Sequence, residues 1–339
     1  MSLGQKKLPR SVTTLTPQRI SFVGGSTDLP AYYENHEGGV ISSAIDKYIY
    51  VTVKRHSPLF QEAYRLSYSK TENVDSLDDI ENIIARECLR FLHVEPPLYI
   101  STAADLPSAS GLGSSSSFCV GLLHALHILR GERVTPAQLA EEACEIEINI
   151  IGNPIGKQDQ YAAAFGGLNH ICFKKSGRVE IDHLVLQNNL IDQIFHNSLL
   201  IWSGTQRSAS DILQKQNTLI GKQIQSYSLL SDATHELKSI ILNPPSNFLE
   251  LFGALLDKTW NAKKKLEDSI SSSEIDAMHL QLKTMGSYGV KLSGAGGGGF
   301  LYALIDESHH QKVLKTLGQA RVLKIAYEPF GSRLLSEVY

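Results

Sequence analysis

The chain has 339 residues, of which 42% are hydrophobic and 20% are charged, and its formal net charge at pH 7 is −3. This length and composition are typical of a globular protein with two domains or one large one. They give no electrostatic reason to bind nucleic acid or an anionic membrane, and no apolar run is long enough to span a bilayer.

Strands and helices are both predicted in the first half of the chain. Extended runs rich in β-branched and aromatic residues indicate strands, and apolar residues at helical spacing indicate helices. The predicted strands are residues 19–23, 39–54 and 98–102, and the predicted helices are residues 80–92, 115–129 and 135–151.

The second half continues this mixture. Predicted strands are residues 167–173, 199–202, 300–305 and 322–327, and helices are expected from residue 208 and over 246–266. Strands and helices follow no steady β-α rhythm, which favours an α+β fold. The polar stretch 174–197 suggests a boundary, and we predict one domain over residues 1–185 and a second over 186–339.

Four cysteines are present: Cys88, Cys119, Cys144 and Cys172. They form no Cys-x-x-Cys pair, and at least three lie among apolar residues. Reduced, packed thiols are the simplest interpretation, and they indicate a cytoplasmic protein. The polar segment 1–10 contains no apolar signal core.

The most informative segment is residues 107–117, which read PSASGLGSSSS and lead into a predicted helix. Backbone N–H groups of such a loop converge on an anion, and the start of the helix adds partial positive charge. The loop lacks the lysine of a Walker A motif. We predict a nucleotide triphosphate site; a serine-rich loop that only caps a core helix is the alternative.

Glu147 is a carboxylate on an apolar helix face. Ala140, Ala143, Cys144, Ile150 and Ile151 would share its side of an α-helix. A carboxylate there is costly unless it is paired or binds a metal. The functional interpretation is a magnesium ligand, and the alternative is a glutamate bonded to a backbone amide or an arginine.

Three further segments carry candidate site residues. Residues 152–161 read GNPIGKQDQY, a turn followed by Asp159, which otherwise caps a short helix. Residues 19–28 read RISFVGGSTD, a strand and turn that a surface salt bridge would also explain. Residues 202–210 contain Thr205 and Arg207 before a predicted helix, a place for an anionic group or a simple helix cap.

A second glycine-rich segment, residues 291–299, reads KLSGAGGGG. It fits G-x-G-x-x-G, but the dinucleotide motif follows a strand and opens a helix. Here we predict a helix pattern before the segment, over residues 278–285, and a strand after it. We therefore reject the dinucleotide interpretation.

Taken together, these motifs resemble the GHMP small-molecule kinases, named for galactokinase, homoserine kinase, mevalonate kinase and phosphomevalonate kinase. The resemblance implies a two-domain fold, with an N-terminal ribosomal-protein-S5-domain-2-like domain, a C-terminal ferredoxin-like α/β sandwich and the active site in the cleft between them. It implies ATP and Mg²⁺ as cofactors, with Ser115 and Glu147 as metal ligands. In this family the third glycine-rich motif packs against the phosphate loop.

The resemblance also assigns roles to individual residues. Asp159 matches the catalytic aspartate and Arg19 the arginine beside it. The residues expected to bind the nucleotide are Pro107, Ser110, Gly111, Leu112, Gly113, Ser114, Ser115, Ser116, Gly296 and Gly297. The residues expected to bind the substrate are Arg19, Ser26, Thr27, Asp28, Lys157, Asp159, Thr205 and Arg207.

Within the family, the motifs are similar to the branch of heptose 7-phosphate kinases. Galactokinases have Glu-His where this chain has Gly25 and Ser26, which argues against galactose. We therefore expect a small-molecule sugar phosphate and ATP as partners, with neither nucleic acid nor membrane, and leave a homodimer open. A kinase for an unphosphorylated sugar and a non-catalytic sugar-sensing regulator remain alternatives.

Overall fold

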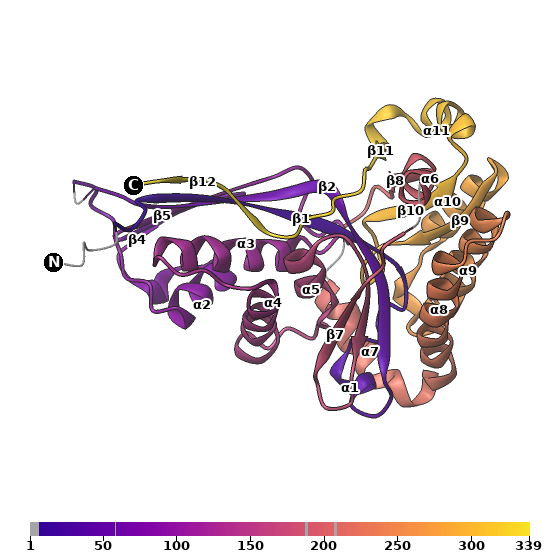
Figure 1. Ribbon diagram of the computed structural model, residues 1–339, viewed down its shortest axis with the longest axis horizontal. Helices are drawn as coiled ribbons and strands as arrows, with labels where there is room; N and C mark the ends of the chain where they lie inside the picture. Colours follow the sequence, from indigo (N-terminus) through magenta and orange to yellow (C-terminus); the bar gives the residue numbers. More distant parts are fainter. Residues whose placement is uncertain (1–6, 58, 187–188, 207–208) are drawn as a thin grey trace.

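Two β-sheets organise the chain (Figure 1). The computed structural model describes residues 7–57, 59–186, 189–206 and 209–339. The larger sheet has the order β12-β1-β2-β5-β3-β4, and β6 pairs with β2 and β7 with β6. The smaller sheet has the order β11-β8-β10-β9 and is antiparallel throughout. The mixture of helices and sheets confirms the predicted α+β class.

The strands of the larger sheet are β1 (Ser11–Val23), β2 (Gly38–Arg55), β3 (Tyr64–Ser67), β4 (Thr71–Val74), β5 (Leu98–Ala104), β6 (Leu168–Phe173), β7 (Val179–His183) and β12 (Arg333–Val338). Those of the smaller sheet are β8 (Ser198–Trp202), β9 (Ser287–Leu292), β10 (Phe300–Ile305) and β11 (Val322–Lys324). The long β2 pairs with β5 along its second half and with β6 along its first half. It therefore links both parts of the larger sheet.

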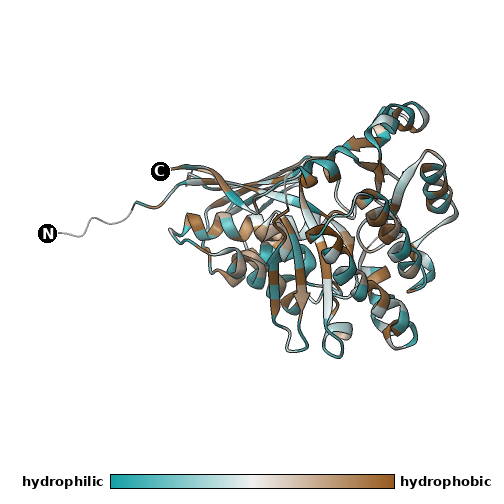
Figure 2. Ribbon diagram, turned by 45° about the vertical axis from the view of Figure 1, so that its right-hand side comes forward, coloured by the Kyte–Doolittle hydropathy of each residue, from teal (hydrophilic) through white to brown (hydrophobic). Residues whose placement is uncertain are grey.

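The helices in the first half of the chain are α1 (Pro30–Tyr33), α2 (Ile83–Phe91), α3 (Ser114–Leu129), α4 (Pro136–Cys144) and α5 (Gln158–Phe165). Those in the second half are α6 (Leu190–His196), α7 (Ala209–Leu219), α8 (Ile224–Leu242), α9 (Phe248–Lys263), α10 (Ser273–Thr284) and α11 (His310–Leu317). In Figure 2 the helices carry both hydrophobic and hydrophilic residues, as expected for elements with one face on a sheet. Within the described residues, no helix has the length and apolarity needed to cross a bilayer.

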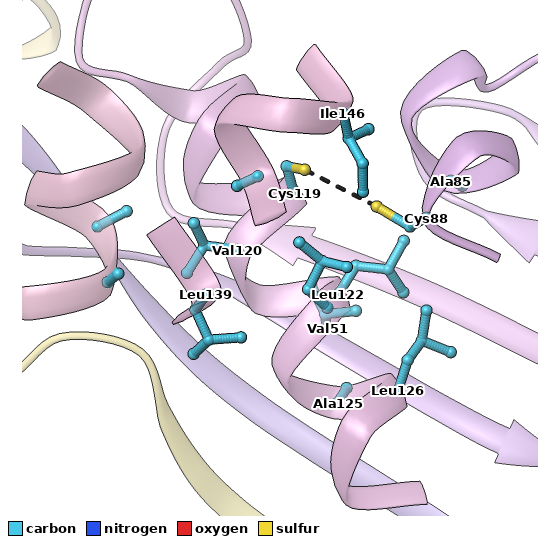
Figure 3. Close-up of a cluster of buried hydrophobic side chains, with 14 of the residues drawn as sticks. Val51, Ala85, Cys88, Cys119, Val120, Leu122, Ala125, Leu126, Leu139 and Ile146 are labelled. Carbon is cyan, nitrogen blue, oxygen red and sulfur yellow. Dashed lines mark hydrogen bonds between the residues drawn. The ribbon is translucent and has the colours of Figure 1, made fainter. Parts of the chain in front are cut away.

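Helix α3 is the central element of the hydrophobic core that lies against the larger sheet. It packs against β1 and β2 on one side and against α2, α4 and α5 on the others. Figure 3 shows its residues Cys119 and Leu122 close to Cys88 of α2, with the two sulfur atoms 3.8 Å apart. All four cysteines are free thiols, and three of them are buried, as predicted.

The C-terminal strand was not predicted from the sequence. β12 pairs with β1, so residues from the end of the chain complete the sheet that the N-terminus begins. Most of its side chains are exposed, so it carries no apolar alternation that would reveal a strand. The boundary at 185/186 stays a prediction, but it places β12 apart from the sheet to which the strand is bonded.

The helix predicted over 135–151 is divided. α4 ends at Cys144, and a wider π-helical turn, Glu145–Ile150, follows it. The wider turn rotates later residues away from the predicted face, so that Ile150 is 46% exposed. Glu147 is nevertheless completely buried. Single π-helical turns of this kind are frequent at functional sites.

The packing around α3 predicts a large cost for truncating its side chains. Leu126 is fully buried, so we expect Leu126→Ala to lower the free energy of unfolding by about 2–5 kcal/mol. Leu280→Ala is the matched control, because Leu280 of α10 is 64% exposed and should cost less than about 0.5 kcal/mol. Urea unfolding of both variants tests this packing, and equal midpoints would contradict it.

Candidate active site

A cavity of about 620 Å³ opens where the end of β1, the start of α3 and the end of α9 converge. Two turns rich in glycine and serine form much of its wall. Among the predicted site residues, those that line it are Arg19, Ser26, Asp28, Ser110, Gly111, Gly113, Ser114, Ser115, Ser116 and Asp159. Segments more than 100 residues apart in the sequence therefore meet at one place.

The predicted phosphate loop ends at the N-terminus of α3. Gly113 has a left-handed backbone, with φ of +79°, and precedes the first helical residue. Leu112 is fully buried and anchors the loop in the core, while its carbonyl oxygen accepts a hydrogen bond from Arg19 N at 3.0 Å. The free N–H groups of the first helical turn thus face a cavity, an arrangement suited to phosphate oxygens.

The two glycine-rich turns touch through their backbones. A Cβ atom on Gly294 would lie 2.6 Å from the Cα of Gly111, closer than real Cβ contacts allow. In addition, Phe300 N donates to Ser110 O at 3.1 Å. The packing expected of the third glycine motif is therefore present in the structure.

The sequence-based description of the segment before this third motif is corrected. Strand β9 precedes it directly, whereas the helix α10 lies further upstream. Residues 287–292 form a strand because Val290 and Leu292 are buried in the smaller sheet. The dinucleotide interpretation still fails, because a strand rather than a helix follows the glycines.

Arg19 and Asp159 form a partly buried ion pair on the cavity wall, in which the Arg19 side chain is 4% exposed and that of Asp159 is 24% exposed. The Arg19 Nε donates to Asp159 Oδ1 at 2.8 Å, and a terminal nitrogen lies 2.7 Å from the same oxygen. The other terminal nitrogen donates to Gly111 O at 2.8 Å. One guanidinium therefore fixes the carboxylate relative to the glycine loop. A charge-assisted network of this kind orients the carboxylate.

Asp28 is a second buried carboxylate in the cavity wall. Its Oδ1 accepts from Ser26 N at 3.1 Å, and its Oδ2 accepts from Gln158 N at 3.2 Å. Burial raises the pKa of Asp28, and the nearby charge of Asp159 raises it further. The backbone amides hold its side chain in one orientation, as a group that reads substrate hydroxyls requires.

Glu147 lies behind the serines of the α3 start. Its Oε2 accepts from Gln160 Nε2 at 2.7 Å, whereas its Oε1 and the hydroxyl of Ser116 have no hydrogen-bond partner. Burial raises the pKa of Glu147 to about 7, and Ser116 and Gln160 act in the opposite direction. A buried carboxylate oxygen without a partner beside serine hydroxyls fits a divalent cation of the Mg²⁺ type.

Lys263 is a site residue that sequence reasoning missed. It is the last residue of α9, 6% exposed, and it lines the cavity. Its signal was present, because Lys263 continues the buried face formed by Leu256, Thr259 and Trp260. This pattern was not recognised because Lys263 begins a run of three lysines. A run of charges is typical of a solvated helix face.

Several predicted site residues do not line the cavity. Thr27 is buried and its hydroxyl donates to backbone oxygens, and Lys157 Nζ donates to Gly177 O at 2.8 Å. Gly296 and Gly297 pack against Ile270, while their neighbours Gly294 and Ala295 face the cavity. The other predicted site residues that do not line the cavity are Pro107, Leu112, Glu147 and Thr205. Arg207 lies outside the described residues.

The raised pKa of Glu147 predicts a pH dependence of stability without divalent cations. Above pH 4.5, the ordinary pKa of this carboxyl group, the unfolded chain releases the proton. The folded chain retains the proton to about pH 7, because burial raises the pKa of Glu147 to that value. Stability should therefore fall by about 3 kcal/mol as the pH rises from 4.5 to above 7. Glu147→Gln should lack this loss, measured by urea unfolding in chelator.

The control for this prediction is Glu145→Gln, which changes an exposed carboxylate on the same π-helical turn. It should keep the wild-type pH dependence. Added Mg²⁺ should stabilise the wild type more than Glu147→Gln. Identical pH profiles for the wild type and Glu147→Gln would contradict a buried, titrating carboxyl.

Comparisons with known proteins agree with this geometry. Residues 80–167 match the family described as "GHMP kinases N terminal domain", and residues 233–322 match "GHMP kinases C terminal". A D-glycero-alpha-D-manno-heptose 7-phosphate kinase of Campylobacter jejuni is 28% identical over 91% of this chain and 93% of the relative.

Solved structures share the fold at lower identity. A D-glycero-D-manno-heptose 1-phosphate kinase from Bacteriodes thetaiotaomicron superposes with a TM-score of 0.78 at 21% identity, over 97% of this chain and 99% of that one. A Lactococcus lactis galactokinase complexed with galactose gives 0.74 at 17%, over 98% and 97% of the two chains. The two family matches together cover more than half of the sequence. The chain therefore belongs to the GHMP kinases and is an ATP-dependent phosphotransferase.

Proposed function

We propose that this protein is an ATP- and Mg²⁺-dependent sugar 1-kinase. Its acceptor is D-glycero-α-D-manno-heptose 7-phosphate, its product is the 1,7-bisphosphate, and its place is in GDP-heptose synthesis for bacterial surface polysaccharide. The observation that carries the proposal is the Arg19–Asp159 pair, which Arg19 also ties to Gly111 of the glycine loop. The named activity of the Campylobacter jejuni relative supports the choice of sugar.

Asp159 is the group that accepts the proton of the anomeric hydroxyl. Its Oδ1 is held by Arg19, which leaves Oδ2 for the substrate. The positive charge of Arg19 offsets charge on the phosphoryl group as it moves. Most of the rate enhancement in phosphoryl transfer comes from such positioning and charge stabilisation rather than from covalent chemistry.

The nucleotide phosphates bind along residues 110–116, which include lining residues of the cavity. Backbone N–H groups at the start of α3 supply the hydrogen bonds, and the helix dipole favours the negative charge. Ser115 and Glu147 would hold the Mg²⁺ ion, which neutralises phosphate charge when bound. Asp28 and Ser26 bind sugar hydroxyls on the acceptor side.

The role of Asp159 predicts a defect in catalysis rather than in folding. Asp159→Asn keeps the shape of the side chain but removes the base, so kcat should fall by roughly 10²–10⁴-fold. The measurement is ADP release in a coupled assay with heptose 7-phosphate. Asp192→Asn on the exposed face of α6 is the matched control and should retain full activity. Full activity of Asp159→Asn would remove the assigned base.

The choice of acceptor predicts a ranking of substrates. With ATP and Mg²⁺, heptose 7-phosphate should give the highest kcat/KM, above dephosphorylated heptose, fucose and galactose. ADP release across this panel is the measurement. A preference for an unphosphorylated sugar would replace the proposed substrate, and no turnover with any sugar would favour a sensor over a kinase.

A further inference from the structure

Lys263 is a buried cation for which the proposed chemistry has no use. It reaches the cavity from α9, an element of the second half of the chain, whereas Arg19 and Asp159 come from β1 and α5. Burying an ammonium group is costly unless it has a partner. A lysine kept in this position therefore indicates either a structural role or a ligand.

The protein supplies Lys263 with only part of what an ammonium group needs. Its Nζ donates to Gly294 O, and within the described residues no other hydrogen bond or ion pair of this nitrogen is present. Burial lowers the pKa of Lys263 to about 8, and the charges of Asp28 and Asp159 act in the opposite direction, but neither carboxylate forms a salt bridge with it. An ammonium group has three N–H donors, so two remain for a ligand.

The other cation of the cavity wall is already committed. Among the described residues that line the cavity, the positively charged side chains are Arg19 and Lys263. Arg19 commits three of its five N–H donors to Asp159 and Gly111, and its charge is paired with that of Asp159. Lys157, one of the residues expected to bind the substrate, donates to Gly177 O and lies over the ring of Tyr33. Among the described residues that line the cavity, Lys263 is thus the cation that has no ion pair.

The backbone leaves space beside this lysine. A Cβ atom on Gly25 would lie 3.9 Å from Lys263 Nζ and from Gln158 Nε2, and 3.5 Å from Ser21 Oγ. The buried Ser21 hydroxyl has no hydrogen-bond partner. Three polar groups therefore lie within 4 Å of the position that a Cβ atom on Gly25 would take, at ordinary contact distances.

We infer that the ammonium group of Lys263 binds a phosphate oxygen of the acceptor, on the group that does not react, and so selects phosphorylated sugars. This inference rests on the proposed sugar kinase activity and adds the residue that recognises its charged substrate. Recognition requires no covalent step: an N–H of the lysine donates to a phosphate oxygen as a charge-assisted hydrogen bond. Asp28, held by Ser26 and Gln158, reads the hydroxyls between this phosphate and the reacting end.

The test compares Lys263→Met, Lys263→Arg and the wild type in the full-length protein. Lys263→Met should lower kcat/KM for heptose 7-phosphate roughly 10–100-fold, mainly through KM, because one hydrogen bond to a charged group is lost. The KM for ATP and kcat/KM for dephosphorylated heptose should change by less than about threefold. Lys263→Arg should recover part of the preference. Lys258→Met, on the exposed side of α9, should match the wild type.

Two outcomes would overturn the inference. Equal losses with both sugars would mean that Lys263 only supports the Gly294 turn, and a selective rise in the KM for ATP would assign it to the nucleotide. If Lys263→Met does not fold, Gly25→Ala takes its place, because the added methyl group meets only ordinary contact distances. Gly25→Ala should selectively weaken the binding of heptose 7-phosphate. An unchanged preference for heptose 7-phosphate over heptose would contradict the inference.

Binding separates this inference from the proposed function. Calorimetry with heptose 7-phosphate and with heptose needs no turnover. If the wild type binds heptose 7-phosphate in a Lys263-dependent way but transfers no phosphoryl group, the proposed activity fails and the inference stands. If Lys263→Met phosphorylates and binds heptose 7-phosphate as the wild type does, the activity stands and the inference fails.

Discussion

The active site depends on a backbone-to-backbone contact between two turns that are far apart in the sequence. Gly111 and Gly294 approach so closely that a side chain on either would push the turns apart. The bond from Phe300 N to Ser110 O continues this contact into β10. The smaller sheet is thereby connected to the loop before α3, and both turns contribute residues to the cavity wall. Glycine is required here for the close approach of two chains.

Arg19 links the glycine loop to Asp159. Its backbone N–H bonds to Leu112 O and its side chain to Gly111 O, so the residue is tied to the glycine loop at two points. The same side chain orients Asp159. Arg19 is itself placed by β1, which pairs with β2 at this point, where Arg19 lies opposite Ala44. The separation between Asp159, the proposed base, and the glycine loop therefore depends on the side-chain contacts of Arg19 and on the pairing of β1 with β2.

The sequence could predict parts of this site for clear physical reasons. Glu147 was found because a carboxylate among apolar residues at helical spacing is costly, and the glycine loop because its composition suits phosphate binding. The pairing of Arg19 with Asp159 joins segments 140 residues apart, and only a family resemblance could suggest it. Lys263 was missed because its neighbours Lys264 and Lys265 suggested a solvated surface. β12 was missed because its pairing, and not its own pattern, makes it a strand.

The charged groups of the site come from both halves of the chain. The groups assigned to chemistry, Arg19 and Asp159, come from β1 and α5, whereas Lys263 comes from α9 and approaches through the turn at Gly294. A second buried lysine, Lys291 of β9, donates to Ser21 O and Phe22 O at the end of β1. Lys291 therefore also links the two halves of the chain. Under the proposed role of Lys263, substitutions in α9 would alter which sugar is recognised while Asp159, Arg19 and the glycine loop keep their positions. Because Asp28 and Ser26 of the first half are proposed to bind the sugar hydroxyls, both halves would share recognition of the acceptor, whereas the proposed transfer groups Arg19 and Asp159 belong to the first half alone.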